Sequence, residues 1–134
     1  MDILKLVDVS KIYGELKALD KINLSVEKGE WISIMGPSGS GKTTMMNIIG
    51  AMDKPSLGEV ILDGEDIAKK SPKELTVIRR DKIGLIFQQF HLVNYLSALE
   101  NVMMSQYYHS MPDAQEAMEA LAAVGLADRA NHLP

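Results

Sequence analysis

The fold of this chain is decided by eight consecutive residues, Gly36-Pro37-Ser38-Gly39-Ser40-Gly41-Lys42-Thr43. They fit the pattern G-x-x-x-x-G-K-[ST] in full. By average residue frequencies, the four fixed positions of the pattern match by chance in only about 1 in 200 chains of this length. Glycines at these positions let the backbone bend so that successive N–H groups point inward at phosphate oxygens. The stretch therefore predicts a loop that binds a nucleoside triphosphate, and ATP with Mg²⁺ is the ligand we expect.

The polar residues of this loop have separate expected roles. Lys42 supplies a mobile positive charge to the β- and γ-phosphates, and the helix that begins near it adds the positive end of its dipole. The Thr43 hydroxyl can bind Mg²⁺, which prefers oxygen ligands. We expect the nucleotide to contact Gly36, Ser38, Gly39, Ser40, Gly41, Lys42, Thr43 and Thr44.

The segments on either side of the loop supply the context that the pattern requires. Residues 31–35 are mostly apolar, as a buried parallel strand is, and residues 43–51 have a helical composition. Residues 83–87 form a second run of the buried-strand type. Strands that alternate with helices predict an α/β fold with some parallel sheet.

Further strands are expected at residues 3–9, at residues 60–62 and at residues 22–26, where apolar and polar side chains alternate. The pair Asp63-Gly64 is a turn signal. Strand character gives way to helices after Gln88-Gln89, where we place a soft boundary between residues 1–89 and 90–134.

Three helices are indicated by their end signals. Ser71-Pro72-Lys73-Glu74 combines a Ser N-cap, a proline at the first position and a capping-box Glu, and this helix should run to about Arg80. Ser97-Ala98-Leu99-Glu100 repeats the capping-box signal. An apolar face from Ala114 to Leu121 predicts the last helix, which Gly125 should stop.

Composition narrows the class of protein. The 134 residues suffice for one domain, and 46% of them are hydrophobic, which favours a packed core. A net charge of −4 argues against nucleic-acid binding, and the absence of cysteine excludes disulfides and thiolate metal sites. His91, His109 and His132 lack metal-ligand spacing. No apolar run approaches the ~18 residues of a membrane span. These features predict a soluble, intracellular protein that does not insert into a membrane.

The sequence resembles the ATP-binding subunits of ABC transporters, especially those of the lipoprotein-release and macrolide-export type. The resemblance covers the whole chain. Besides the phosphate loop, the stretches that carry it are Leu6-Val7-Asp8-Val9-Ser10-Lys11-Ile12-Tyr13-Gly14, Leu19-Asp20-Lys21-Ile22-Asn23-Leu24, Gly58-Glu59-Val60-Ile61-Leu62-Asp63-Gly64, Ile83-Gly84-Leu85-Ile86-Phe87-Gln88-Gln89-Phe90 and Leu99-Glu100-Asn101-Val102. The resemblance implies a P-loop NTPase (RecA-like) parallel sheet core with an N-terminal antiparallel β subdomain and the start of a helical subdomain, in truncated form.

The resemblance also implies roles for two residues outside the loop. Tyr13 matches an aromatic residue that stacks on adenine, a pairing that suits two π-faces. Gln88 matches a glutamine that reaches Mg²⁺ and positions the attacking water. Lys42 and Gln88 are therefore the two residues to which the resemblance gives a catalytic role. Gln89 is the alternative, but the family pattern puts the glutamine directly after Phe87.

Partners are implied in the same way. In the family, the region that corresponds to Phe90–Leu99 receives a coupling helix of the transmembrane permease subunit, and exposed apolar side chains on a loop would suit that role. The alternative is that these side chains pack under the helices. A second ATP-binding subunit would complete a dimer at the cytoplasmic, inner face of the cell membrane.

The chain ends just before the position of the family's Leu-Ser-Gly-Gly-Gln signature, and it lacks the later acidic (Walker B) strand, its following Glu and the switch histidine. Loss of a general base alone removes about 10²- to 10⁴-fold of catalysis. We therefore expect little or no ATPase activity from these 134 residues. The alternative function is a non-hydrolytic nucleotide-binding or interaction fragment. A kinase or GTPase would not explain Tyr13, the Phe87-Gln88 loop and Leu99-Glu100-Asn101-Val102 together.

Overall fold

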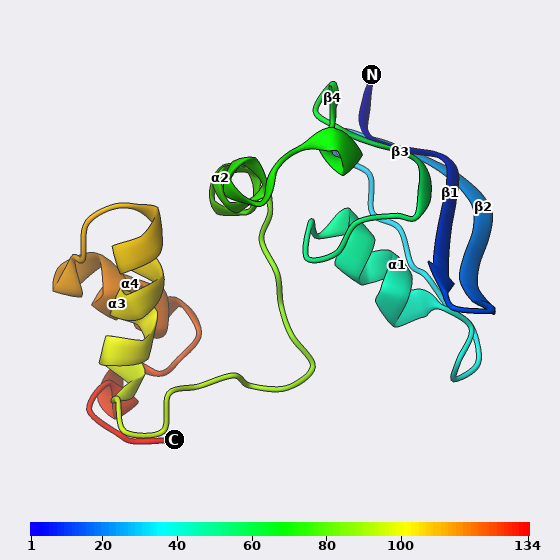
Figure 1. Cartoon of the computed structure of the whole chain (residues 1–134). Helices are drawn as coiled ribbons and strands as arrows, with labels where there is room; N and C mark the ends of the chain where they lie inside the picture. Colours follow the sequence, from blue (N-terminus) through cyan, green and yellow to red (C-terminus); the bar gives the residue numbers. More distant parts are fainter. The chain divides into compact units, whose positions relative to one another are not determined.

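The computed structural model describes all residues from Met1 to Pro134, in two compact units. The first unit is Met1–Ile83 and the second is Gly84–Pro134. Each unit is described by itself below, and Figure 1 shows the elements of both. The boundary expected at Gln88-Gln89 remains a prediction.

The first unit is built on a four-stranded antiparallel sheet with the order β2-β1-β3-β4. Strands β1 (Asp2–Tyr13) and β2 (Leu16–Glu27) form a long hairpin, and β1 also pairs with β3 (Leu57–Leu62). The short strand β4 (Glu65–Asp66) follows β3 across a tight turn. Asp63 and Gly64 both have positive φ in that turn, 49° and 84°. Positive φ at both positions is what a two-residue hairpin of this kind requires. The expected strands at 3–9, 22–26 and 60–62 are confirmed, within longer strands.

One helix covers this sheet and closes the core of the first unit. Helix α1 (Lys42–Ile49) follows the phosphate loop and lies beside the sheet in Figure 1. Its Ile48 is almost fully buried in the same cluster as Leu6, Val9 and Val60 of the sheet. Burial of such apolar side chains is the main favourable term in folding. The sheet and α1 therefore stabilise each other.

The rest of the first unit consists of a short 3₁₀ turn, η1 (Ile67–Lys69), and helix α2 (Pro72–Lys82). At the start of α2 the Ser71 hydroxyl accepts from the Glu74 N–H (3.3 Å), and Glu74 Oε2 accepts from the Ser71 N–H (2.7 Å). This reciprocal pair is the expected capping box, which is thereby confirmed. The helix runs two residues past the expected end at Arg80.

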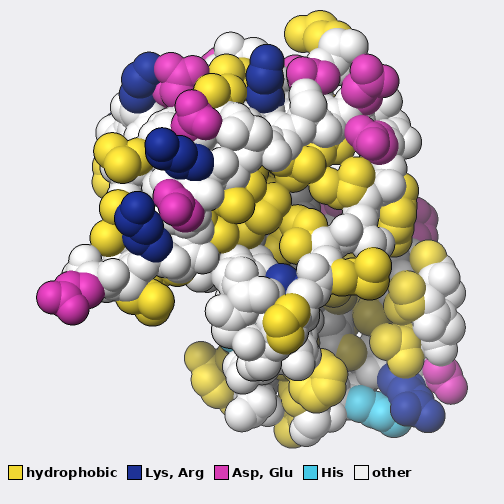
Figure 2. Space-filling model, turned by 90° about the vertical axis from the view of Figure 1, so that its right-hand side faces the viewer, with side chains coloured by type: hydrophobic (Ala, Val, Ile, Leu, Met, Phe, Trp, Pro, Cys, Tyr) yellow, Lys and Arg dark blue, Asp and Glu magenta, His cyan; other side chains and the backbone are white.

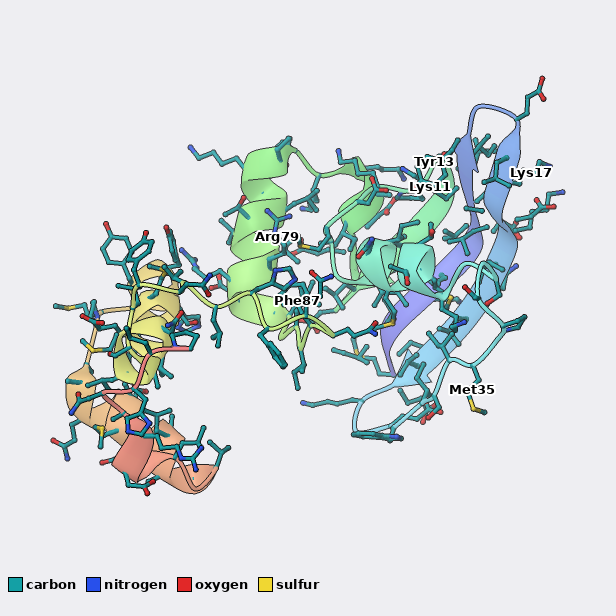
Figure 3. All side chains as sticks on the ribbon, turned by 90° about the horizontal axis from the view of Figure 1, so that it is seen from below. Lys11, Tyr13, Lys17, Met35, Arg79 and Phe87 are labelled. Carbon is teal, nitrogen blue, oxygen red and sulfur yellow. The ribbon has the colours of Figure 1, made fainter.

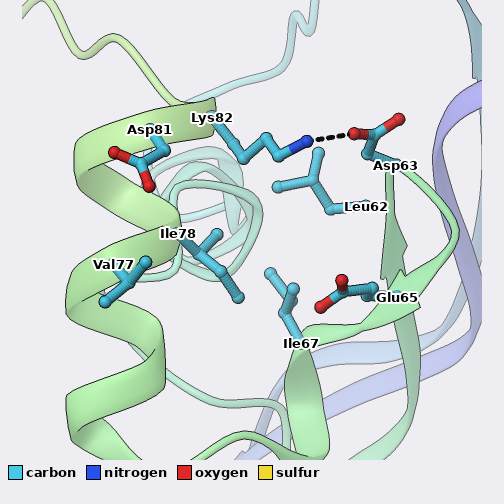
Figure 4. A pocket seen from close by; sticks show the side chains of 8 residues that line it. All are labelled: Leu62, Asp63, Glu65, Ile67, Val77, Ile78, Asp81 and Lys82. Atoms are coloured by element: carbon cyan, nitrogen blue, oxygen red, sulfur yellow. Dashed lines mark hydrogen bonds and ion pairs between the residues drawn. The ribbon is translucent and has the colours of Figure 1, made fainter.

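Helix α2 and the β3–β4 turn enclose a small cavity of about 160 Å³. Figure 4 shows Leu62, Ile67 and Ile78 directed toward it from three different elements. At its rim the Lys82 ammonium donates to the Asp63 carboxylate, and this contact lowers the pKa of Asp63. The apolar lining and the ion pair together attach α2 to the sheet.

Two segments differ from the expectation of buried parallel strands. Residues 31–35 and 83–87 form no strand, and Trp31 is 92% exposed while Ile86 is fully exposed. A strand exists only through backbone hydrogen bonds to a neighbouring strand, and no other segment of the chain pairs with these two. Figure 2 shows hydrophobic side chains lying open among interspersed acidic and basic ones on one face. The apolar runs are present, but the strand prediction is wrong for these two segments.

The second unit is a pair of helices, α3 (Ala98–His109) and α4 (Ala114–Ala123), followed by the 3₁₀ turn η2 (Ala127–Arg129). The two helices pack side by side, with Ala117 and Leu121 of α4 buried. The expected capping box at Ser97 and the last helix are confirmed. None of the helices in the chain is long and apolar enough to cross a membrane.

The loop before α3 is held by a single side chain, Asn101. Its amide nitrogen lies within hydrogen-bonding distance of the carbonyl oxygens of Val93 (3.2 Å), Leu96 (3.1 Å) and Ser97 (3.0 Å). Its amide oxygen accepts from the Val93 N–H at 2.9 Å. Because Asn101 is partly buried, removing its side chain would leave the Val93 N–H and the Leu96 carbonyl without this partner, whereas the Val93 and Ser97 carbonyls also accept from backbone N–H groups.

Replacing Asn101 by alanine should lower the free energy of unfolding of the second unit by about 1–3 kcal/mol, since partly buried donors and acceptors are left unpaired. The measurement is urea unfolding followed by helical circular dichroism. Asn94→Ala, at an exposed position of the same loop, is the matched control and should have little effect. Equal stability of the Asn101 and Asn94 variants would contradict the role given to Asn101.

Candidate nucleotide-binding site

The phosphate loop leads directly into the first turn of α1. Within the loop the Ser40 N–H donates to the Pro37 carbonyl (3.1 Å), and Gly39 and Gly41 have φ values of 81° and 97°. Gly41 is the N-cap residue of α1, no side chain caps this end, and the first turn holds no acidic residue. An uncapped helix N-terminus presents N–H groups and the positive end of the dipole, which together suit an anion.

Gly41 is held close to the second strand. A Cβ atom at this position would lie 2.6 Å from the Ala18 carbonyl oxygen and 3.1 Å from Leu19 Cδ2. The left-handed φ of Gly41 is a further reason for glycine, because that conformation is strained for residues with a Cβ atom. The start of α1 can therefore reach β2 only with glycine at position 41.

Lys42 crosses back over the loop that precedes it. Its ammonium donates to the carbonyl oxygens of Gly36 and Pro37, the latter at 2.9 Å, and lies 3.4 Å from the Ser40 hydroxyl. A flexible four-carbon side chain can exchange such partners for phosphate oxygens without moving the backbone. The charge of Lys42 is thus already positioned over the loop.

A cavity of about 550 Å³ opens in front of this loop, within the size range of ligand sites. Of the residues predicted to bind nucleotide, it brings together Tyr13, Ser38, Gly39, Gly41, Lys42, Thr43 and Thr44. Gly36 and Ser40 belong to the same loop but do not line the cavity.

Sequence reasoning missed three residues of this cavity wall, Leu16, Lys17 and Ala18. They follow the hairpin turn, where Tyr13 pairs with Leu16 and Ile12 pairs with Lys17. The turn residue Gly14 and the alternating pattern of β2 could have indicated this return of the chain beside Tyr13.

Tyr13 lies at the end of β1 with half of its surface exposed. Its hydroxyl donates to Asp53 Oδ2 at 3.2 Å, and the Lys11 ammonium lies 5.3 Å from the centre of its ring. Figure 3 shows Lys11 and Tyr13 next to each other. The ring is therefore held from two sides, at its hydroxyl and over its face.

The carboxylate of Asp53 is hydrogen-bonded to the Lys11 side chain and to the Lys54 N–H. Its partial burial favours a higher pKa, but hydrogen bonds from the Lys11 side chain and the Lys54 N–H, with the charge of Lys11, hold the pKa below its usual value. The Lys11 ammonium lies 3.1 Å from the carboxylate and 2.7 Å from the Lys54 carbonyl oxygen. Asp53 is thus ionised at neutral pH and accepts hydrogen bonds only.

The donor set fits a magnesium-bound nucleotide. No group of three His, Asp or Glu side chains in the chain could hold a metal ion by itself. Mg²⁺ is commonly bound by one or two protein oxygens together with substrate phosphates, and the exposed Thr43 hydroxyl offers such an oxygen beside the loop. Gln88 belongs to the second unit, so its role as a further magnesium ligand remains a prediction, as does the alternative Gln89.

The second unit has a larger apolar cavity of about 710 Å³, lined by residues of the expected coupling region and of α3 and α4. Phe90 and Tyr95 are 88% and 82% exposed, whereas Val93 and Leu96 are half-buried. The apolar side chains of residues 90–99 therefore divide between the two expectations: some pack under the helices and some face outward.

Three features define a P-loop nucleotide-binding protein. They are a loop bounded by glycines, a lysine that crosses this loop, and a helix with an uncapped N-terminus that packs on a sheet. Residues 19–134 match the family model described as ABC transporter. The chain belongs to the ABC transporter ATP-binding family, and the resemblance found in the sequence is confirmed.

Several known proteins are similar to this chain in sequence. An uncharacterized ABC transporter ATP-binding protein of Methanocaldococcus jannaschii, MJ0796, is 48% identical and matches 98% of this chain and 61% of its own length. The lipoprotein-releasing system ATP-binding protein LolD of Bacteroides thetaiotaomicron is 44% identical, over 98% of this chain and 62% of the relative. The macrolide export ATP-binding/permease protein MacB 1/2 of Paracoccus denitrificans is 42% identical, over 90% of this chain and 19% of the relative.

A solved structure supports the same fold. The dimeric structure of the ATP-binding cassette MJ0796, in a post-hydrolysis state bound to ADP and Pi, superposes with a TM-score of 0.89 at 46% identity. The match covers 98% of this chain and 61% of that one. The chain thus shares the α/β fold of an ABC ATPase cassette, and it spans about three fifths of the length of this relative.

Gly41→Ala should destabilise the first unit more than Gly39→Ala does. A left-handed φ costs an alanine about 1–2 kcal/mol at either position. Both glycines have such a φ, but only Gly41 lies against another strand, and nothing lies within 4 Å of a Cβ atom built at Gly39. Thermal unfolding of the two variants measures the difference. Equal midpoints would show that the approach of Gly41 to Ala18 does not constrain the fold.

Proposed function

We propose that this chain is the nucleotide-binding part of an ABC transporter ATPase. It binds Mg-ATP at the loop from Gly36 to Thr44, and the complete protein couples ATP hydrolysis to the export of a substrate. The observation that carries the proposal is the uncapped N-terminus of α1 with Lys42 held over the loop and Tyr13 on the same cavity. This arrangement offers a phosphate site and an aromatic surface within one cavity.

Individual residues would each contact a different part of the nucleotide. The loop N–H groups and Lys42 hold the β- and γ-phosphates, and Thr43 binds Mg²⁺. The ring of Tyr13 stacks on adenine. Gln88 positions the attacking water and completes the magnesium site, because phosphoryl transfer depends mainly on alignment and on neutralising charge. Bound Mg²⁺ supplies the charge that neutralises the transferring phosphate.

Two protein partners belong to this proposal. A transmembrane permease subunit docks on the exposed side chains of residues 90–99, and this contact holds the chain at the inner face of the membrane. Their outward position and the adjacent apolar cavity support such a surface. A second ATP-binding subunit completes the ATPase, which is supported by the dimeric form of the MJ0796 cassette. Two relatives carry names that place them in lipoprotein release and macrolide export.

The test is calorimetric binding of Mg-ATP to the 134-residue chain and to its Lys42→Ala variant. The variant should bind about 10- to 100-fold more weakly, because charge-assisted hydrogen bonds to phosphate contribute about 1.5–3 kcal/mol. Lys73→Ala, an exposed lysine on α2, is the matched control and should bind as the unchanged chain does. Equal affinities for the Lys42 and Lys73 variants would refute the phosphate site.

A second expectation concerns turnover. The 134 residues hold no Leu-Ser-Gly-Gly-Gln signature, and no second acidic strand supplies a general base. Steady-state ATP hydrolysis should therefore be at the background of the assay. Phosphate release by the purified chain, with Lys42→Ala as the background, measures it. Turnover that disappears in the Lys42 variant would show that the chain hydrolyses ATP by itself.

A further inference from the structure

Tyr13 and its neighbours in β1 also make contacts outside the nucleotide cavity. The loop that follows α1, residues 50–56, is fastened to the last four residues of β1 by several hydrogen bonds. The Ser56 N–H donates to the Ser10 carbonyl (2.8 Å), the Ile12 N–H donates to the Ser56 hydroxyl (2.9 Å), and the Tyr13 hydroxyl donates to Asp53 (3.2 Å). The end of β1 is thus tied to this loop by both backbone and side chains.

Asp53 is itself fixed by α1. Its N–H donates to the Asn47 carbonyl of the last turn of α1 at 3.2 Å, and its Oδ1 accepts from the Lys54 N–H at 2.8 Å. A carboxylate held in this way has little freedom to follow a moving tyrosine. It therefore sets the position of the Tyr13 hydroxyl, and does not merely respond to it.

Lys11 supports the same geometry from the strand. It bonds both Asp53 Oδ1 and the Lys54 carbonyl, and its ammonium lies over the Tyr13 ring. A base that stacks on Tyr13 would use the opposite face, because the ammonium occupies this one. Since Tyr13 is half-exposed at the end of a hairpin, these contacts limit the orientations of its ring.

We propose that Asp53, with Lys11, is a positioning residue for the adenine subsite. By binding the Tyr13 hydroxyl it orients the ring before the nucleotide arrives, so that binding the base does not have to order the side chain. The proposal rests on the nucleotide-binding function given above, and it adds a residue that does not touch the nucleotide. The competing explanation is that the Asp53 contacts only stabilise the fold of the first unit.

The two explanations differ in which ligand is affected. We would measure calorimetric affinities for Mg-ATP and for magnesium tripolyphosphate, which has the phosphates but no base. The variants are Asp53→Ala, Tyr13→Phe, which keeps the ring but loses the hydroxyl, and the double variant. Glu65→Ala removes another carboxylate that is paired with a lysine, here an exposed one at 3.0 Å from Lys70, and is the matched control.

Asp53→Ala and Tyr13→Phe should each weaken Mg-ATP binding by about threefold to tenfold, which corresponds to the usual net contribution of one hydrogen bond, and leave tripolyphosphate binding within about twofold. The double variant should bind ATP no more weakly than Asp53→Ala alone, because both changes break the same interaction. Glu65→Ala should bind both ligands as the unchanged chain does.

Other outcomes would overturn the proposal in distinct ways. Equal losses for ATP and tripolyphosphate would show that Asp53 supports only the fold. An unchanged ATP affinity in Tyr13→Phe would show that the hydroxyl contact does not orient the ring, even if Asp53→Ala fails to fold. If the unchanged chain binds tripolyphosphate but not ATP, the adenine subsite is wrong while the phosphate loop stands. If it binds neither ligand, the proposed function itself fails.

Discussion

The close approach of Gly41 to the Ala18 carbonyl is the constraint on which the rest of the first unit depends. It brings the start of α1 against β2 and leaves no room for a side chain. Once α1 begins there, its Ile48 enters the core beside Leu6 and Val60. Glycine at this position is thus required twice, for the left-handed turn of the loop and for the contact between helix and strand. The phosphate site and the core of the unit share one residue.

A second set of contacts holds the other end of α1. The loop after the helix is bonded to the end of β1 through Ser56 and Asp53, and Arg79 of α2 donates to the Ala51 carbonyl at 2.6 Å. Figure 3 shows Arg79 on α2 in this part of the unit. The helix is therefore attached by polar contacts after its last turn, by the close approach of Gly41 to β2 at its start, and by apolar burial along its length. Such redundancy suits a site that must keep its geometry when charged ligands bind.

Much of this could be predicted from the sequence because the signals are local. The eight residues of the phosphate loop define their own turn, and Ser71 and Ser97 begin helices through hydrogen bonds three residues away. Alternation of side chains indicates the antiparallel strands but not their order, since pairing depends on residues far apart in the chain. The residues around Tyr13 were missed for the same reason: Asp53 is forty positions away from it.

The apolar runs at 31–35 and 83–87 show a different limit. Hydrophobic side chains in a short run identify a segment that favours burial, but strand formation also needs a partner at the right distance. Trp31 and Ile86 find none among residues 1–134 and stay exposed. The role of Gln88 is left untested for a related reason. This residue directly follows one of these segments and belongs to the second unit. Sequence pattern therefore predicts the composition of a core better than its assembly.

Helix α1 connects the two parts of the candidate site through its own backbone. An eight-residue helix rises by roughly 12 Å from end to end. The phosphate loop leads into its first turn, and Asp53, which binds the Tyr13 hydroxyl, is hydrogen-bonded to Asn47 of its last turn. The helix therefore fixes the separation between the phosphate loop and Asp53, so that neither can shift along the helix axis without the other.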